Sequence, residues 1–70
     1  MPKLPGVKVQ EAIRAFERVG FKVVRQSGHV IMSNGVLTIS IPRGNPINAF
    51  TMARIVLDAG LTIERFKQLL

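Results

Sequence analysis

The dipeptide Asn34-Gly35 constrains the fold of this sequence more than any other local feature. Asn-Gly supplies the two positive-φ positions of a type I′ turn, whose twist joins two strands into a tight hairpin. The flanking segments, His29–Ser33 and Val36–Ile41, both have strand-like composition, and apolar and polar residues alternate in the second. The sequence therefore predicts an antiparallel hairpin, ended by Pro42, which cannot donate to a ladder of strand hydrogen bonds.

Before this hairpin, apolar residues recur at three- and four-residue spacing, which is the pattern of one buried helix face. The members of this stripe are Val9, Ala12, Ile13, Phe16 and Val19. The stripe predicts a helix over residues 7–19, which Gly20 ends because glycine adopts the left-handed conformation at little cost. We expect Met1–Gly6 to be a frayed arm and Phe21–Gln26 to be a first strand.

After the hairpin, a loop over residues 43–46 precedes a second helical stripe. Its members are Met52, Ile55, Val56 and Ala59. The stripe predicts a helix that Gly60 ends, with Asn48 or Thr51 as its N-cap. Thr62 is a suitable N-cap for a short last helix over residues 63–70.

These elements predict the order helix, three strands, helix and short helix. Because a chain of 70 residues supports one hydrophobic core, we expect a single domain over residues 1–70. The economical arrangement is an α+β fold, in which a three-stranded antiparallel sheet carries the helices on one face.

Composition narrows the classes of function. Ten Lys and Arg residues against four Asp and Glu residues give a net charge of +6, which points to a polyanionic partner or an acidic protein partner. With no cysteine and one histidine, the chain has no disulfide or thiol chemistry, and we expect no metal site and no cofactor. No apolar segment approaches the length of about 18 residues that a membrane span needs, and no signal peptide is recognisable. We therefore expect a cytoplasmic protein that does not associate with membranes.

His29 is the candidate catalytic residue, because histidine is the side chain whose ordinary pKa lies nearest neutrality. A neutral imidazole can take the proton from a ribose 2′-hydroxyl, whose oxygen then attacks the adjacent phosphorus, and this cleaves RNA without a metal. Gly28 would let a phosphodiester chain approach closely. The plainer interpretation, a histidine that is solvent-exposed or hydrogen-bonded and has no catalytic role, is favoured by composition alone.

Basic residues flank this histidine along the chain. Arg25 lies just before it and Arg43 follows the third strand, so both would flank His29 on one surface if the strands are neighbours. Phosphate contact is the functional interpretation for these residues and for Lys22, and ordinary surface charge is the alternative. A base-stacking platform is not expected, because there is no Trp or Tyr and all four Phe residues fit core or staple positions.

The second predicted helix carries apolar residues outside its buried stripe, namely Phe50, Ala53 and Leu57. One interpretation is a wider contact with the core. The other is an exposed apolar patch for a protein partner or for weak self-association through this helix.

Several short motifs follow one another along the chain in a characteristic order. They are Gly20-Phe21, Val24-Arg25-Gln26, Ser27-Gly28-His29, Asn34-Gly35, Ile41-Pro42, Gly44-Asn45, Thr51, Ile55 and Ala59-Gly60-Leu61 followed by Phe66. In this order and spacing, from Val9 to Phe66, the sequence resembles the HicA toxin family. Members are small mRNA-cleaving proteins with an α-β-β-β-α fold like that of double-stranded-RNA-binding domains. The family motif is usually Gly-Ser-His, and its catalytic histidine maps onto His29.

The resemblance implies the toxin of a type II toxin–antitoxin system, a metal-independent endoribonuclease that cleaves mRNA with His29 as general base. It also implies two partners, mRNA and a HicB-type antitoxin that covers the active site. The residues expected to contact RNA or its phosphates are Lys22, Arg25, Ser27, Gly28 and Arg43. The alternative is a non-catalytic RNA-binding or protein-interaction module with the same fold.

The sequence departs from the family pattern at several of these positions. Ser27 stands where glycine is usual, and Gly28 stands where serine is common. Arg43 replaces a histidine that many members carry, so the chain has no second imidazole. Phe50 replaces a glycine, and Ala53 and Leu57 replace residues that are often basic. These three changes weaken the RNA-binding face of the second helix.

Overall fold

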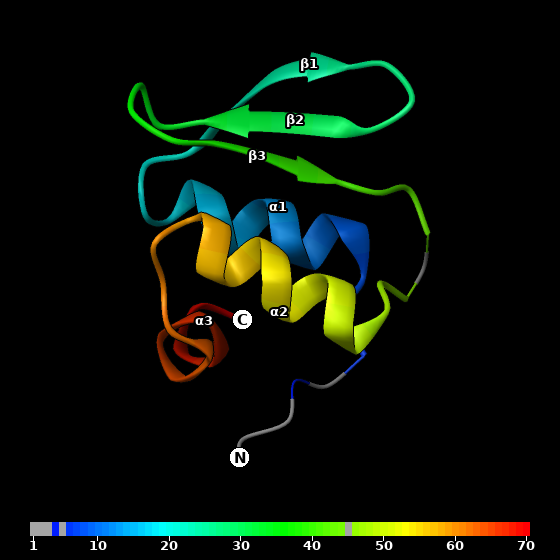
Figure 1. The fold of residues 1–70 in the computed structure, drawn as a ribbon, viewed down its shortest axis with the longest axis vertical. Helices are drawn as coiled ribbons and strands as arrows, with labels where there is room; N and C mark the ends of the chain where they lie inside the picture. The colour runs from blue at the N-terminus through cyan, green and yellow to red at the C-terminus, as the bar shows by residue number, and fades with distance from the viewer. Residues whose placement is uncertain (1–3, 5, 45) are drawn as a thin grey trace.

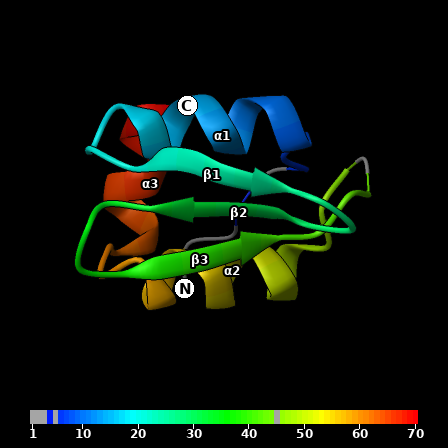
Figure 2. The same cartoon turned by 90° about the horizontal axis from the view of Figure 1, so that it is seen from above.

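The computed structural model describes residue 4, residues 6–44 and residues 46–70. Its elements are α1 (Val9–Glu17), β1 (Lys22–Gln26), β2 (Val30–Ser33), β3 (Thr38–Ile41), α2 (Ala49–Asp58) and α3 (Ile63–Leu69). The strands form one antiparallel sheet in the order β1-β2-β3, and the helices lie on one face of it (Figures 1 and 2). The predicted α+β fold, α-β-β-β-α with a short C-terminal helix, is confirmed.

A β-bulge in β1 decides which side chains of that strand face the helices. Val23 pairs with buried Met32, and Gln26 pairs with buried Val30, so Val23 and Gln26 lie on the helix-covered face. The register shifts between Val23 and Arg25. Without this shift Val23 and Arg25 would share a face, because side chains alternate along a strand. The bulge therefore places Arg25 on the opposite, uncovered face of the sheet.

The loop between β2 and β3 differs from the type I′ turn that the sequence predicts. Pairing of the two strands ends at Ser33 and Thr38, which leaves a four-residue loop. Gly35 has a φ of 93°, but no described residue other than glycine has a positive φ, so Asn34 does not take the required turn conformation. Its side-chain Oδ1 instead accepts a hydrogen bond of 2.7 Å from the N–H of Leu37. Asparagine thus stabilises a wider loop through its side chain.

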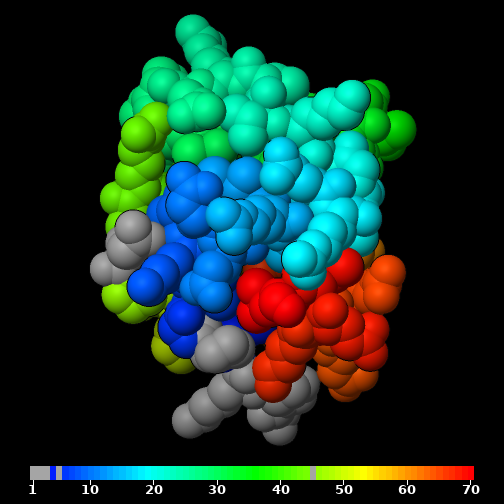
Figure 3. Space-filling view, turned by 180° about the vertical axis from the view of Figure 1, so that it is seen from behind, coloured from blue at the N-terminus to red at the C-terminus, as the bar shows by residue number. Residues whose placement is uncertain are grey.

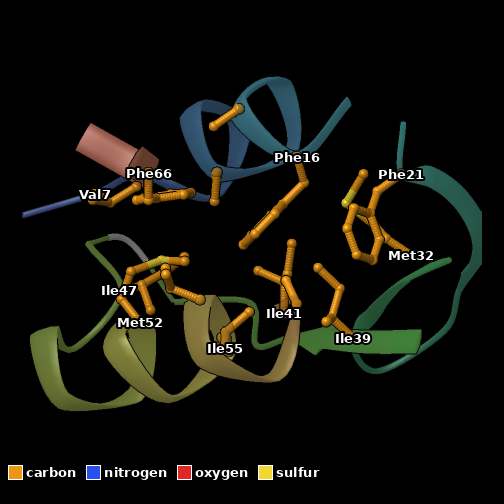
Figure 4. Packing of buried hydrophobic residues seen from close by; sticks show 14 of the residues in the cluster. Val7, Phe16, Phe21, Met32, Ile39, Ile41, Ile47, Met52, Ile55 and Phe66 are labelled. Atoms are coloured by element: carbon orange, nitrogen blue, oxygen red, sulfur yellow. The ribbon is translucent and has the colours of Figure 1, made fainter. Parts of the chain in front are cut away.

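Phe16 of α1 lies at the centre of the core (Figure 4). Its ring is edge-on to that of Phe21 at 5.7 Å, and its centroid lies 5.1 Å from that of Phe66 in α3. Ile41 of β3 and Met52 of α2 are completely buried in the same cluster. Full burial of one such side chain contributes about 1.5–3 kcal/mol, so this cluster holds the helices against the sheet.

The part of the N-terminal segment that the structure describes packs against the domain, so the predicted frayed arm is wrong there. Leu4 and Val7 are buried. Val7 accepts a hydrogen bond of 2.8 Å from the N–H of Ile47, in an isolated antiparallel bridge. Because Val7 is extended in this bridge, α1 begins at Val9, two residues later than predicted. The bridge joins the start of α1 to the segment before α2. Residues 1–3 and 5 of the predicted arm lie outside the described chain.

The predicted caps and glycine stops are largely confirmed, although α1 ends at Glu17, two residues earlier than predicted. Asn48 caps α2, since its Oδ1 accepts from the N–H groups of Phe50 at 2.9 Å and Thr51 at 3.3 Å. Asn48 is therefore the N-cap of α2, and Thr51 is not. Thr62 caps α3 as predicted. The glycines after α1 and α2 both have positive φ, as a glycine stop requires.

Candidate functional site

Ser27, Gly28 and His29 form the bend between β1 and β2, and all three are exposed. β2 begins at Val30, one residue later than predicted, so His29 lies outside the strand ladder. Within the part of the chain that the structure describes, the His29 imidazole has no hydrogen-bond or ion-pair partner. The ring nitrogens are therefore free to contact a bound ligand.

The backbone beside this histidine is also accessible. A Cβ built on Gly28 would meet no atom within 4 Å, and Gly28 does not have a positive φ. Neither backbone conformation nor packing within the chain therefore demands glycine at this position. What the missing side chain provides is open space for an approaching ligand.

The strand register brings the segment after β3 to the same end of the sheet. Gln26, Val30 and Ile41 pair across the three strands, next to the bend over residues 27–29 and just before residues 42–44. Figure 1 shows this end with the starts of α1 and α2 on the same side of the molecule. The bend, residues 42–44 and the starts of α1 and α2 therefore border one end of the fold.

Arg43 links two of these segments. Its Nη2 donates a hydrogen bond of 3.4 Å to the backbone carbonyl of Gln26, the residue before Ser27. Arg43 is exposed and has no carboxylate partner among the described residues. Its charge is therefore available to an anion at the end of the sheet that carries His29.

A shallow hollow of about 230 Å³ lies between α1 and this end of the sheet. Its lining residues are Val9, Gln10, Ile13, Gln26, Val30 and Arg43. Seen from behind, α1 and the segment after β3 are both at the surface here (Figure 3). The floor of the hollow is apolar and its rim carries two amides and one guanidinium, so it can hold a flat, partly polar group.

Arg25 and Lys22 do not join this hollow. Arg25 pairs with Ile31 on the uncovered face, on the opposite side of β1 from Gln26. Lys22 pairs with Ser33 at the far end of β1, about 10 Å from Gln26, because their partners Ser33 and Val30 are three residues apart on β2. The structure thus groups Gln26 with Arg43 at the hollow, and places Lys22 and Arg25 outside it on the other face of the sheet.

No carboxylate lies between Glu17 and Asp58 in the sequence. The whole sheet, its loops and the segment before α2 therefore contain only cations and neutral groups. The one ion pair in the described chain, Arg54 with Asp58 at 3.6 Å, lies on the exposed surface of α2. The cations of the sheet and its loops form no ion pair within the described chain, so their positive charge near His29 is available to an anionic ligand.

The spare apolar residues of α2 are largely exposed. Phe50 is 88% exposed and Leu57 is 60% exposed, whereas Ala53 is half-buried. The prediction that every Phe fits a core or staple position is therefore wrong for Phe50. Because Phe50 and Leu57 are seven residues apart, they share one face of the helix. The described chain leaves both apolar side chains open to solvent, and the exposed Arg54 lies between them on this face.

The described residues contain no group of three or more side chains able to hold a metal ion. They also contain no helix that is long and apolar enough to cross a membrane.

Comparison with known families places the chain among the toxins of bacterial toxin–antitoxin systems. The matching model is that of the HicA toxin, and it covers residues 9–61, from the start of α1 to the residue before the N-cap of α3. Because the match spans most of the 70 residues, the chain belongs to the HicA toxin family, as the resemblance predicted. Neither curated proteins nor solved structures gave a significant match.

The sequence already held signals for part of this site. The Ser27-Gly28-His29 motif and Arg43 were visible as candidates. The interval without acidic residues can also be read directly from the sequence. Only the structure shows that this interval contains all three strands of the sheet. No sequence pattern indicated that Gln10 and Gln26 line the hollow, because their positions there depend on how α1 packs beside β1.

Proposed function

We propose that this protein is the toxin of a type II system and a metal-independent endoribonuclease that cleaves mRNA, with His29 as general base. One observation carries the proposal. An exposed, unpartnered imidazole lies beside the open backbone of Gly28, at an end of the sheet whose cations form no ion pair in the described chain. Membership of the HicA family supports the toxin part of the proposal.

In the proposed reaction, the neutral imidazole of His29 accepts the proton of a ribose 2′-hydroxyl. The 2′-oxygen attacks the adjacent phosphorus, and the bond from phosphorus to the 5′-oxygen breaks. The products are a 2′,3′-cyclic phosphate, which hydrolyses to a 3′-phosphate, and a 5′-hydroxyl. Because the chain has no second histidine, the departing 5′-oxygen takes its proton from solvent.

The proposed contacts to the scissile phosphate come from the same end of the sheet. The Arg43 guanidinium offsets the negative charge that grows on the phosphate oxygens during the attack. Ser27 supplies an exposed hydroxyl donor, and Gly28 allows the phosphodiester close to the backbone. The hollow between α1 and Gln26 accommodates a neighbouring base or ribose.

The proposed protein partner is a HicB-type antitoxin. The exposed Phe50 and Leu57 offer an apolar surface, and the net charge of +6 favours a partner with acidic surface. The same helix face also suits weak self-association, which sedimentation over a range of concentrations would detect. Since the substrate is mRNA, the proposed place of action is the cytoplasm.

The decisive test compares wild type with His29→Ala in growing cells. We expect wild type to arrest growth and to generate RNA fragments with 5′-hydroxyl ends, and His29→Ala to do neither. Arg65→Ala, an exposed change on α3 that is distant from the sheet, is the matched control and should behave as wild type. Equal cleavage by wild type and His29→Ala would refute the assignment.

The lack of a second imidazole favours one other function, a non-catalytic RNA-binding module. In that case the purified wild-type protein would bind RNA with a strong salt dependence and leave it intact, and His29→Ala would bind equally well.

A further inference from the structure

The face of the sheet that the helices do not cover carries a regular set of outward side chains. Figure 2 looks onto this face, which we call the open face. Strand pairing arranges its residues in two rows, Arg25–Ile31–Ser40 and Lys22–Ser33–Thr38. Each row has a cation on β1 and a hydroxyl on β3. The rows are about 7 Å apart along β2, two residues at the usual rise of a strand.

The open face is positively charged and has no internal counterion. Lys22 and Arg25 are exposed, and neither forms an ion pair within the described chain. All residues of the face lie in the interval without carboxylates, between Glu17 and Asp58. An anionic chain laid across it would gain charge contacts and meet no repulsion, so the charge of the face is complementary to a polyanion.

The open face is continuous with the candidate active site. The row that contains Arg25 is the nearer of the two to the bend over residues 27–29. The bulge in β1 turns Arg25 onto this face, and bulges often redirect a side chain next to a functional site. A nucleic-acid strand bound at His29 therefore has a cationic surface to follow immediately beyond the bend.

We propose that the open face binds a single-stranded segment of the RNA that is cut at His29, an inference that rests on the proposed function. Arg25 and Lys22 contact phosphates of this segment, and the hydroxyls of Ser33, Thr38 and Ser40 donate to phosphate or ribose oxygens. Binding is sequence-tolerant, because these contacts are to the phosphate and ribose backbone and not to base edges.

The geometry of the cleavage reaction requires that the RNA segment on the open face be single-stranded. Attack by a 2′-oxygen requires that this oxygen, the phosphorus and the 5′-oxygen lie in line, and a regular A-form duplex does not hold them so. RNA that enters the site at His29 has therefore left the duplex geometry, and its continuation over the adjoining Arg25 row is unpaired. Proteins bind such unpaired backbone along positively charged surfaces.

The test measures binding without cleavage, in the His29→Ala background. A labelled oligouridine of about 16 nucleotides is titrated by fluorescence anisotropy over a range of salt concentrations. The variant Lys22→Gln/Arg25→Gln removes both cations of the open face. The matched control, Arg65→Gln/Lys67→Gln, removes the same charge from exposed positions on α3. Thermal melts verify that all variants are folded.

Each phosphate contact to a single strand contributes about 0.7 to the slope of log K against log salt, so losing two contacts lowers its magnitude by about 1.4. We expect this drop for the open-face variant, and a slope close to that of the parent for the α3 control. Equal slopes for the two variants would overturn the proposal. The proposal would also be overturned if an RNA duplex of the same length bound as tightly as the single strand, and if the open-face variant lowered its salt slope by the same amount.

These outcomes separate the inference from the nuclease assignment. If His29→Ala cleaves RNA as wild type does, the nuclease assignment fails, whereas the slope measurement still decides whether the open face binds RNA. If cleavage depends on His29 but Lys22→Gln/Arg25→Gln leaves the slope unchanged, only the open-face proposal fails.

Discussion

Two phenylalanines of this protein offer a matched pair for testing the core. Phe16 is completely buried, whereas Phe50 is 88% exposed, and each sits in a helix. Replacing each by alanine removes the same atoms from opposite environments. The comparison therefore separates burial from the intrinsic effect of the substitution on a helix.

The expected cost of Phe16→Ala follows from its surroundings. A buried aromatic ring removes about 150–250 Å² from water, which at about 25 cal/mol per Å² corresponds to about 4–6 kcal/mol. Measured substitutions of this kind cost about 3–5 kcal/mol. A domain of 70 residues has a total stability of about 4–10 kcal/mol, so Phe16→Ala removes a large part of it. Phe50→Ala should stay within about 0.5 kcal/mol of wild type.

Urea denaturation followed by circular dichroism measures both free energies of unfolding. Phe16→Leu, which keeps an apolar side chain, provides a folded reference if the alanine variant is too unstable to analyse, and should cost about 1.5 kcal/mol or less. A loss of stability in Phe50→Ala that matches that of Phe16→Ala would refute the reasoning, because the outer face of α2 would then be part of the core.

Three further predictions use the same structure. Asn48→Ala removes the N-cap of α2 and should cost about 1 kcal/mol, a fall of about 4–8 °C in Tm by calorimetry, while Thr51→Ala, the other capping candidate, changes Tm much less. Gly35→Ala places a side chain at a φ of 93° and should cost about 1–2 kcal/mol in urea denaturation, whereas Gly28→Ala, in open space, leaves stability near wild type. Cleavage of RNA by the purified protein should persist in excess chelator, and loss of cleavage that Mg²⁺ restores would contradict the metal-independent mechanism.

The features that the sequence predicted well are local ones. The stops at Gly20 and Gly60 and the cap at Thr62 depend on the conformational preferences of single residues, and the structure has all three. The turn at Asn34-Gly35 was placed correctly but given the wrong type, because Asn34 uses its side chain in place of a left-handed backbone.

The features that were missed depend on contacts between distant segments. The bulge in β1 arises from how β1 pairs with β2, and it moves Arg25 away from the surface that Arg43 shares with Gln26. The bridge between Val7 and Ile47 joins residues forty positions apart, and no local sequence pattern around Val7 predicts it. The exposed His29 could be proposed from its motif, but its lack of an internal partner required the fold.

The bulge in β1 also affects how one molecule meets another. β1 is an edge strand of the sheet, and an exposed edge is where a foreign strand can add and start aggregation. The irregular spacing around Val24, with a cation on either side of it, makes this edge a poor template for such growth. A small sheet can in this way protect one of its two edges without a further strand or helix over it.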